Sequence, residues 1–180
     1  MPKIAVVGPE STGKSWLSAR LAQQLGGTWI AEVAREFLEN LGRPYTKADV
    51  LEIARRQREA DCTATTTSWI FLDTNLLVLQ VWMEVAYNEV PDWIPEFLKS
   101  KTEQPDFYLL TFPDLPWEPD PLREHPEMRE ELFYRYQELL ELYHLPFGIV
   151  RGEGEVRTQN AEFLIQQYFE NQVPKQFGGL

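Results

Sequence analysis

Cysteine is nearly absent from this sequence, in which Cys62 is the single example among 180 residues. An internal disulfide needs two cysteines, and such sparing use is typical of proteins from a reducing compartment. The sequence also lacks any apolar run near the ~20 residues that a membrane-spanning helix requires. A predicted strand begins at the N-terminus, and we expect no signal peptide before it. The sequence therefore predicts a cytoplasmic protein with no membrane partner.

Basic residues are scarce as well. Lysine and arginine together number 17 against 28 aspartates and glutamates, which gives a net charge of −11 at pH 7. Basic surfaces bind the phosphate backbones of nucleic acids and the headgroups of anionic membranes, so neither is an expected partner. The two histidines, His125 and His144, are isolated from each other in the sequence. We expect both at the surface rather than in a metal site or a catalytic triad.

Several signature motifs of nucleotide-dependent proteins are missing. The sequence holds no N-K-x-D segment, which reads guanine, and neither H-R-D nor D-F-G. A GTPase and a protein kinase are therefore disfavoured. The remaining composition, 43% hydrophobic and 25% charged residues, is ordinary for a globular protein with one core. We expect a single domain over residues 1–180, in which 173–180 form a flexible tail.

The most informative segment spans residues 8–15, GPESTGKS, and matches the phosphate-binding loop pattern G-x-x-x-x-G-K-[ST]. It follows the apolar run IAVV and precedes a helical pattern with Leu17, Leu21 and Leu25 on one face. A polyphosphate needs several converging backbone N–H groups, and glycine lets the chain wrap closely around it. The positive end of the following helix adds to this field. We expect the nucleotide to contact Gly8, Glu10, Ser11, Thr12, Gly13, Lys14, Ser15 and Trp16.

The phosphates and their metal ion require further groups of defined chemistry. Lys14 would reach the outer phosphates, and the Ser15 hydroxyl would ligate the Mg²⁺ that accompanies ATP. Asp73 closes the apolar run WIFL, at the strand end where ligands of open α/β sheets lie. Its carboxylate can serve as a second metal anchor, or it can cap a helix that starts at Thr74, and the two roles can coexist.

Short β-rich runs alternate with longer helical patterns along the chain, which is typical of an α/β protein with a parallel sheet. The expected strands are residues 3–7, 28–31, 69–73, 107–111 and 147–151. One helix is expected after the phosphate loop and one short helix within 88–105. Further helices are expected over about 46–61, 74–87, 126–143 and 158–170. A Thr46–Asp49 capping box would begin the first of these four. We predict a five-stranded, mainly parallel sheet with helices on both faces.

Glu32 follows the second predicted strand and lies close in sequence to Arg35 and Glu36. In a phosphoryl transfer, a carboxylate at that position can face the acceptor hydroxyl and act as base or orienter. Arg35 can contact the substrate or a phosphate. The alternative for these residues is a solvated group of charges in a first helical turn.

Residues 112–126 contain five prolines and form a long loop, which in a compact domain is usually functional or disordered. Phosphoryl transfer develops negative charge, and a lid loop can deliver the guanidinium of Arg123, or of Arg129, once substrate is bound. Both arginines can instead pair with the surrounding glutamates at the surface. Trp117 either stacks on a substrate base or caps the edge of the core.

Taken in order, several segments resemble one known family, the ribosylnicotinamide kinase domain of NadR-type NAD-biosynthesis proteins. The resemblance covers about residues 3–170, and its most specific parts are A-R-E-F and P-W-x-x-D-x-L-R. The matching residues are Gly8 to Ser15, Ala34-Arg35-Glu36-Phe37, Ile53-Ala54 with Gln57, Phe71-Leu72-Asp73-Thr74-Asn75, and Leu115-Pro116-Trp117 with Asp120-Pro121-Leu122-Arg123.

The resemblance implies a P-loop kinase fold with a lid loop and ATP-dependent phosphorylation of nicotinamide riboside at its 5′-hydroxyl. It would place Lys14 and Ser15 on the phosphates and Mg²⁺, Asp73 near the metal, and Arg123 in the lid. The chain departs from the family pattern at Asn75, where the family usually has aspartate, and at Pro121, where it favours glycine. It would be a kinase module without the nucleotidyltransferase and DNA-binding parts found with this domain elsewhere.

The expected function is therefore that of a small-molecule kinase. ATP and an acceptor, most simply a nucleoside such as nicotinamide riboside, would bind under a closing lid. A kinase for another small metabolite remains open, as does an ATP-switched binding module that hydrolyses slowly. Because proline stiffens residues 112–126, we expect the hinges of the lid at its ends, near Thr111 and His125.

Overall fold

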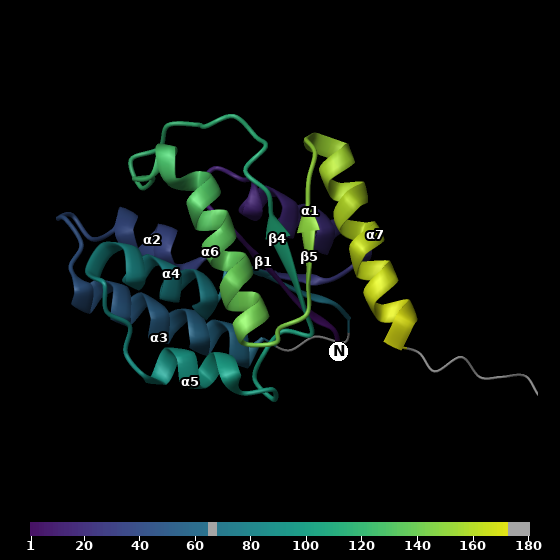
Figure 1. Cartoon of the computed structure of the whole chain (residues 1–180), viewed down its shortest axis with the longest axis horizontal. Helices are drawn as coiled ribbons and strands as arrows, with labels where there is room; N and C mark the ends of the chain where they lie inside the picture. Colours follow the sequence, from purple (N-terminus) through teal and green to yellow (C-terminus); the bar gives the residue numbers. More distant parts are fainter. Residues whose placement is uncertain (65–67, 173–180) are drawn as a thin grey trace, which may run out of the picture.

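The computed structural model describes residues 1–64 and 68–172, and a five-stranded sheet forms the centre of this part of the chain. The strands are β1 (Lys3–Val7), β2 (Thr28–Ile30), β3 (Ile70–Asp73), β4 (Phe107–Thr111) and β5 (Phe147–Val150). Their order is β2-β3-β1-β4-β5, and every neighbouring pair is parallel (Figure 1). The predicted five-stranded parallel sheet is therefore confirmed.

Alternating residues of the central strands face opposite sides of the sheet, as the two-residue period of a strand requires. Ile4 and Val6 of β1 belong to one hydrophobic cluster, with residues of α1 (Lys14–Leu25) and α7 (Gly154–Gln172). Ala5 and Val7 belong to the other cluster, on the opposite face. The helices of that second face are α2 (Val33–Glu39), α3 (Lys47–Thr63), α4 (Leu76–Tyr87), α5 (Trp93–Lys99) and α6 (Arg129–Leu142).

Most helix boundaries agree with the expectations from sequence. The capping box at the start of α3 is present, because an Asp49 carboxylate oxygen accepts from the Thr46 backbone N–H at 2.8 Å. The short helix expected within residues 88–105 is α5. The segment from Pro126 begins with a 3₁₀ turn, Pro126–Met128, before α6. The expected tail at 173–180 lies outside the described residues.

Two helix starts were wrong by a few residues. α7 begins at Gly154 rather than near residue 158, because its first turn carries glycine and glutamate and has no apolar periodicity to reveal it. α4 begins at Leu76 rather than at Thr74, because Asn75 caps it by accepting from the Leu77 N–H at 3.0 Å. No helix within the two described ranges is long and apolar enough to cross a membrane.

The sheet topology fixes where a ligand can bind. β1 lies between β3 and β4, so the chain segments that leave the carboxyl ends of these strands diverge and leave a crevice between them. The phosphate loop follows β1, and the proline-rich segment, residues 112–125, follows β4. Figure 1 shows this segment arching over that end of the molecule before it enters α6. The expected site residues therefore gather at one edge of the sheet.

Candidate active site

A cavity of about 1040 Å³ opens at the carboxyl ends of the strands. The whole phosphate loop lines it, together with the start of α2, one face of α4 and part of the segment 112–125. Of the residues expected from sequence to contact nucleotide or acceptor, it brings together Gly8, Glu10, Ser11, Thr12, Gly13, Lys14, Ser15, Trp16, Glu32, Arg35 and Arg123. Asp73 lies at the end of β3 beside Lys14, whereas Trp117 is absent from the lining.

The phosphate loop depends on its glycines. Gly8 has φ 140°, and a Cβ there would collide with the Thr111 side chain and lie 2.9 Å from the Thr111 carbonyl oxygen. Gly13 has φ 72° and precedes α1 directly. The Thr12 hydroxyl donates to Pro9 O at 2.8 Å and lies 2.7 Å from the Thr111 hydroxyl, which fastens the loop to β4. The backbone is thus curled as anion binding by consecutive N–H groups requires.

Lys14 is held within this loop. Its ammonium donates to the carbonyl oxygen of Pro9 at 2.8 Å. Burial lowers the pKa of Lys14, and the carboxylates of Glu32, Asp73 and Glu10 oppose that shift. A cation in this position, surrounded by backbone N–H groups, suits the outer phosphates of a nucleotide.

Asp73 has the character expected of a metal anchor. The side chain is 2% exposed, and its Oδ1 has no hydrogen-bond partner among the described residues. Burial raises the pKa of Asp73, while the nearby Ser15 hydroxyl and the Lys14 charge oppose the shift. The next residue, Thr74, has φ 70°, a strained conformation for a β-branched side chain and one that is concentrated at functional sites.

The alternative role of Asp73 as a helix cap is wrong, because Asn75 takes it. The Asn75 carboxamide accepts from the Leu77 N–H through Oδ1 and donates to the Tyr108 hydroxyl at 3.0 Å through Nδ2. Asn75, which departs from the family's Asp-Thr-Asp pattern, therefore provides both a donor and an acceptor between α4 and β4. The Asp73 carboxylate does not cap α4.

The pair of Ser15 and Asp73 fits a magnesium ion. Mg²⁺ commonly binds proteins through one or two oxygens and takes its other ligands from substrate phosphates and water. The orphaned Oδ1 of Asp73 beside the Ser15 hydroxyl supplies such a set. Within residues 1–64 and 68–172, no group of three or more His, Cys, Asp or Glu side chains could hold a metal ion by itself.

Glu32 lines the cavity beside the phosphate loop. Burial raises its pKa, the Lys14 charge lowers it, and the nearby Asp73 carboxylate raises it further. Arg35, in the first turn of α2, pairs with the Asp120 carboxylate at 3.0 Å. Arg35 therefore ties α2 to the proline-rich segment.

The proline-rich segment rests on the phosphate loop. The Glu10 carboxylate accepts from the backbone N–H groups of Glu124 and His125 at 3.0 and 3.1 Å. Arg123 donates to the Glu118 carbonyl at 2.5 Å and to the Ser11 hydroxyl at 3.3 Å. His144 is exposed as expected, and His125 is half-buried at the cavity, where Glu10 holds its backbone N–H.

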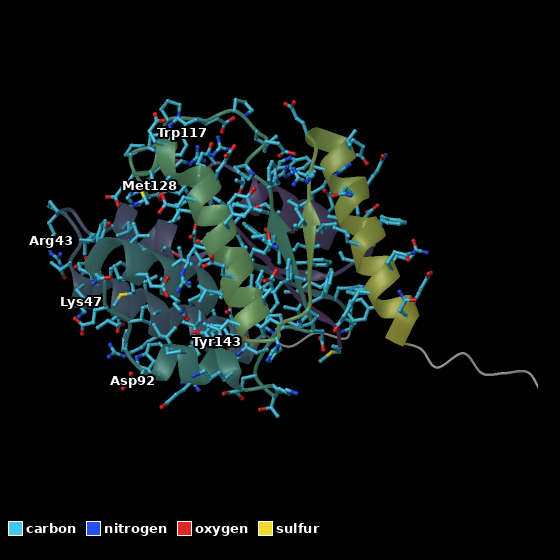
Figure 2. All side chains as sticks on the ribbon, in the orientation of Figure 1. Arg43, Lys47, Asp92, Trp117, Met128 and Tyr143 are labelled. Atoms are coloured by element: carbon cyan, nitrogen blue, oxygen red, sulfur yellow. The ribbon has the colours of Figure 1, made fainter. Side chains whose placement is uncertain are left out.

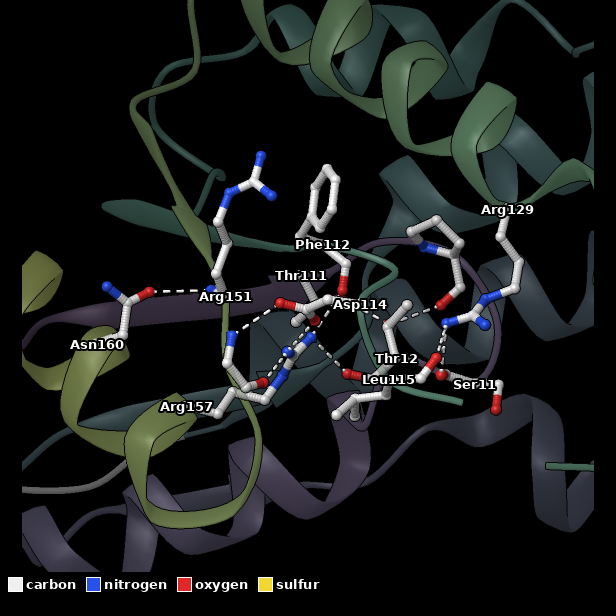
Figure 3. A network of polar contacts seen from close by, with 12 residues as sticks. Ser11, Thr12, Thr111, Phe112, Asp114, Leu115, Arg129, Arg151, Arg157 and Asn160 are labelled. Carbon is white, nitrogen blue, oxygen red and sulfur yellow. Dashed lines mark hydrogen bonds and ion pairs between the residues drawn. The ribbon is translucent and has the colours of Figure 1, made fainter. Parts of the chain in front are cut away.

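Two arginines join the phosphate loop to the root of this segment (Figure 3). Arg129 donates to the carbonyls of Ser11, at 3.2 Å, and Leu115, at 2.7 Å. Arg157 is fully buried and donates to the carbonyls of Thr12 and Phe112, both at 2.9 Å.

Asp114 completes the Arg157 contacts, because its carboxylate accepts from Arg157 at 2.7 Å and from the Gly152 N–H at 2.8 Å. Sequence reasoning missed Arg157, since an arginine in a polar helical turn carries no local sign of burial. Arg129, expected as a lid residue, instead contacts main-chain carbonyls of the loop and of the segment root.

The other half of the cavity is apolar and aromatic, and sequence reasoning did not identify it. Its walls include Val78, Val81 and Trp82 on one face of α4, with Tyr45 and Tyr136. The Tyr45 and Trp82 rings meet edge to face at 5.2 Å. The apolar residues of α4 recur every three to four positions, which is a signal for this wall. An ordinary helix face packed in the core has the same spacing, so the pattern does not distinguish the two.

Tyr45 connects this half to the proline-rich segment. Its hydroxyl donates to the Glu124 carboxylate at 2.7 Å and accepts from the Trp82 indole N–H at 3.3 Å. Burial, followed by the Glu124 contact, raises the pKa of Tyr45 to about 12, so the hydroxyl stays protonated as a donor. Trp117, which belongs to this segment, lies at the outer edge of the molecule (Figure 2).

Comparison with solved structures identifies similar folds. The NadR protein in complex with NR has a TM-score of 0.76 and 24% identity, and the match covers 93% of this chain but 51% of that chain. This chain thus spans about half the length of that NadR structure. The deoxyadenosine kinase from M. mycoides has a TM-score of 0.63 and 22% identity, with 92% and 98% of the two chains covered.

The shikimate kinase from Acinetobacter baumannii is more distant, with a TM-score of 0.54 and 16% identity over 96% of each chain. No curated protein matches the sequence. These structural neighbours are P-loop kinases, so the fold implied by the resemblance to NadR-type domains is confirmed. Residues 3–157 also match a protein family described as AAA domain. Since this match covers most of the chain, the protein belongs to the AAA domain family and has the fold of P-loop kinases.

Proposed function

We propose that the protein is a kinase that transfers a phosphoryl group from ATP to the 5′-hydroxyl of a nucleoside, with nicotinamide riboside as the preferred acceptor. The observation that carries the proposal is the continuity of one cavity from the phosphate loop to an aromatic chamber, with Glu32 on its wall. A nucleotide at the loop and a ring-bearing acceptor in the chamber would meet beside this carboxylate.

On the nucleotide side, Lys14 and the loop N–H groups would bind the outer phosphates. Ser15 and Asp73 would hold Mg²⁺, which when bound neutralises charge on the phosphate oxygens. Arg123, which donates to the Ser11 hydroxyl from the proline-rich segment, would stabilise the negative charge that develops during transfer. Closure of residues 116–125 would exclude water and so favour transfer over hydrolysis.

On the acceptor side, Glu32 would orient the hydroxyl and accept its proton. A base works best when its pKa lies near the working pH, and burial raises that of Glu32 in this direction. Arg35 would contact the acceptor or its new phosphate when it leaves Asp120. A stacking role for Trp117 remains part of the proposal, although it needs the segment to move.

The choice of nicotinamide riboside has two supports. One is the likeness to NadR in complex with NR. The other is chemical, because the nicotinamide ring of this nucleoside is cationic, and aromatic faces such as Trp82 and Tyr45 attract cations. A nearby carboxylate, Glu124, adds negative charge at the same place. A kinase for another nucleoside or metabolite is the second candidate, supported by the likeness to deoxyadenosine and shikimate kinases.

The test is a coupled ADP-release assay over a panel of nucleosides and shikimate. We expect ADP release that depends on nicotinamide riboside, and a Glu32→Gln variant slower by about 10²-fold or more, the usual contribution of a general base. Glu36→Gln, an exposed change on the same helix, is the matched control and should behave as wild type. ADP release that is equal with and without every acceptor would reject a kinase in favour of an ATP-hydrolysing switch.

A further inference from the structure

The start of α2 is capped in an unusual way. The first N–H groups of a helix have no partner within the helix and are normally satisfied by the side chain of the residue at the cap. Glu32 occupies that position, but its side chain makes no capping hydrogen bond. The carboxamide of Gln57, on α3, accepts from the Val33 N–H at 2.9 Å instead. A residue 24 positions along the chain therefore caps α2.

The orientation of this carboxamide is fixed from its other side. Gln57 is fully buried, and its Nε2 donates to an Asp61 carboxylate oxygen at 2.9 Å. A backbone N–H can only donate, so a flipped amide would turn its NH2 group toward the Val33 N–H and lose that bond. Asp61 is itself held from β1, because the Lys3 ammonium donates to its carbonyl at 2.6 Å.

The consequence concerns Glu32. An acid at a helix N-terminus is attracted to the free N–H groups and the positive end of the helix. The Glu32 side chain makes no such bond and lines the cavity instead. The charged groups around it there are Lys14 on α1, Asp73 on β3, Glu10 in the phosphate loop and its own helix neighbour Arg35.

We propose that Gln57 is a positioning residue that, oriented by Asp61, holds the start of α2 so that the Glu32 carboxylate faces the acceptor hydroxyl. This inference rests on the proposed function, in which Glu32 serves the acceptor. Gln57 does not line the cavity, so it acts on the reaction only through the backbone next to Glu32.

The experiment compares Gln57→Leu with Gln80→Leu, which makes the same change at a matched place. Gln80 is 4% exposed, and its carboxamide also makes two side-chain hydrogen bonds, to Glu84 at 2.9 Å and from Tyr143 at 3.0 Å. It lies on α4 outside the cavity lining. We expect Gln57→Leu to lower kcat tenfold or more with the KM for ATP unchanged, and Gln80→Leu to stay within twofold of wild type. Equal effects of both changes would overturn the proposal.

Conservative replacement gives a second comparison. Asp61→Asn keeps an oxygen that accepts from Gln57, so we expect it to retain kcat, whereas Asp61→Leu removes the acceptor and should lower kcat as Gln57→Leu does. Val33→Pro offers a variant with Gln57 intact, because proline removes the N–H that Gln57 accepts from and is well tolerated at a first helical position. It should reproduce the loss of kcat, and wild-type activity in Val33→Pro would overturn the proposal.

A readout without turnover separates this inference from the proposed function. Amide hydrogen exchange at Val33 reports the bond through which Gln57 holds the start of α2. Gln57→Leu should speed exchange of this N–H tenfold or more, whereas Gln80→Leu should leave it unchanged. Faster exchange in Gln57→Leu with no kinase activity in wild type would support the positioning role and reject the kinase, and unchanged exchange in Gln57→Leu would reject the positioning role.

Discussion

The buried Asp61 predicts an unusual dependence of stability on pH. This side chain is 7% exposed, and burial raises its pKa from the ordinary value of 3.8 to about 7, although the Gln57 contact and the Lys3 charge oppose the shift. The folded protein therefore keeps this proton up to about pH 7, whereas the unfolded chain releases it near pH 4. Between these values the folded state holds more protons, so its stability falls as pH rises.

The magnitude follows from the same difference. Each pKa unit corresponds to about 1.36 kcal/mol, so ionisation of Asp61 lowers the free energy of unfolding by up to about 4 kcal/mol between pH 4 and pH 8. That is a large part of the 5–15 kcal/mol typical of a domain. Carboxylates with lowered pKa, such as Asp120 and Glu84, act in the opposite direction and below pH 4, because they lose their contacts only when protonated.

The assay is urea unfolding of wild type and Asp61→Asn, followed by tryptophan fluorescence from pH 4.5 to 8.5. Asparagine cannot ionise and keeps an oxygen for Gln57, so the variant should gain stability relative to wild type as pH rises, by up to about 4 kcal/mol. The new amide can add a constant offset, which the pH dependence removes. Two parallel stability curves over this range would refute the raised pKa and the reasoning from burial.

Three further predictions concern the cavity. MgATP at a hundred times its dissociation constant should stabilise the fold by about 2.7 kcal/mol, and Lys14→Ala should abolish most of the thermal shift; an unchanged shift would contradict the phosphate-loop assignment. Asp73→Asn should lower turnover at limiting magnesium by roughly tenfold to a hundredfold. It should not lower the stability of the fold, because burial already disfavours the charged form of Asp73. Normal activity of the variant across a magnesium titration would show that Asp73 has no metal role. Arg123→Ala should lower kcat more than it raises KM, because the lost contact belongs to the transition state. Hydrogen exchange should show residues 116–125 protected only when both substrates are bound. Equal protection of these residues with and without substrates would remove the lid from the mechanism.

Features that depend on a short stretch of the sequence alone were predictable. The phosphate loop follows from two glycines and a lysine at fixed spacing, and the structure gives Gly8 and Gly13 the positive φ values that the pattern requires. The strands were visible because a buried parallel strand is a continuous apolar run, as β1 and β4 are. Asp73 was identified as a metal candidate because it ends such a run at the edge where ligands bind.

The features that sequence reasoning missed all depend on partners far apart in the chain. Arg157 meets the Thr12 carbonyl 145 residues away, and Gln57 meets Val33 across 24 residues. Nothing in the sequence around Arg157 distinguishes it from a surface residue, and the helical spacing of Gln57 with Ile53 and Ala54 does not reveal its partner on α2. Likewise, Trp82 reads as part of an apolar helix face until Tyr45 is placed beside it. Only the tertiary structure distinguishes these roles.

These long-range contacts also revise the expected mechanics of the lid. The sequence placed the first hinge near Thr111, where the proline-rich segment begins. In the structure, Arg157 fixes the carbonyl of Phe112 and Arg129 fixes that of Leu115, and both arginines hold the phosphate loop at the same time. Rotation about Thr111 would break the bonds to Phe112 and Leu115, and the loss of a partner by a fully buried guanidinium is costly. We expect the contacts that open for an acceptor to lie further along, where Arg35 meets Asp120 and Tyr45 meets Glu124 at the surface. We therefore expect the moving part of the lid to begin after Leu115, while the contacts of Arg129 and Arg157 hold its root to the phosphate loop.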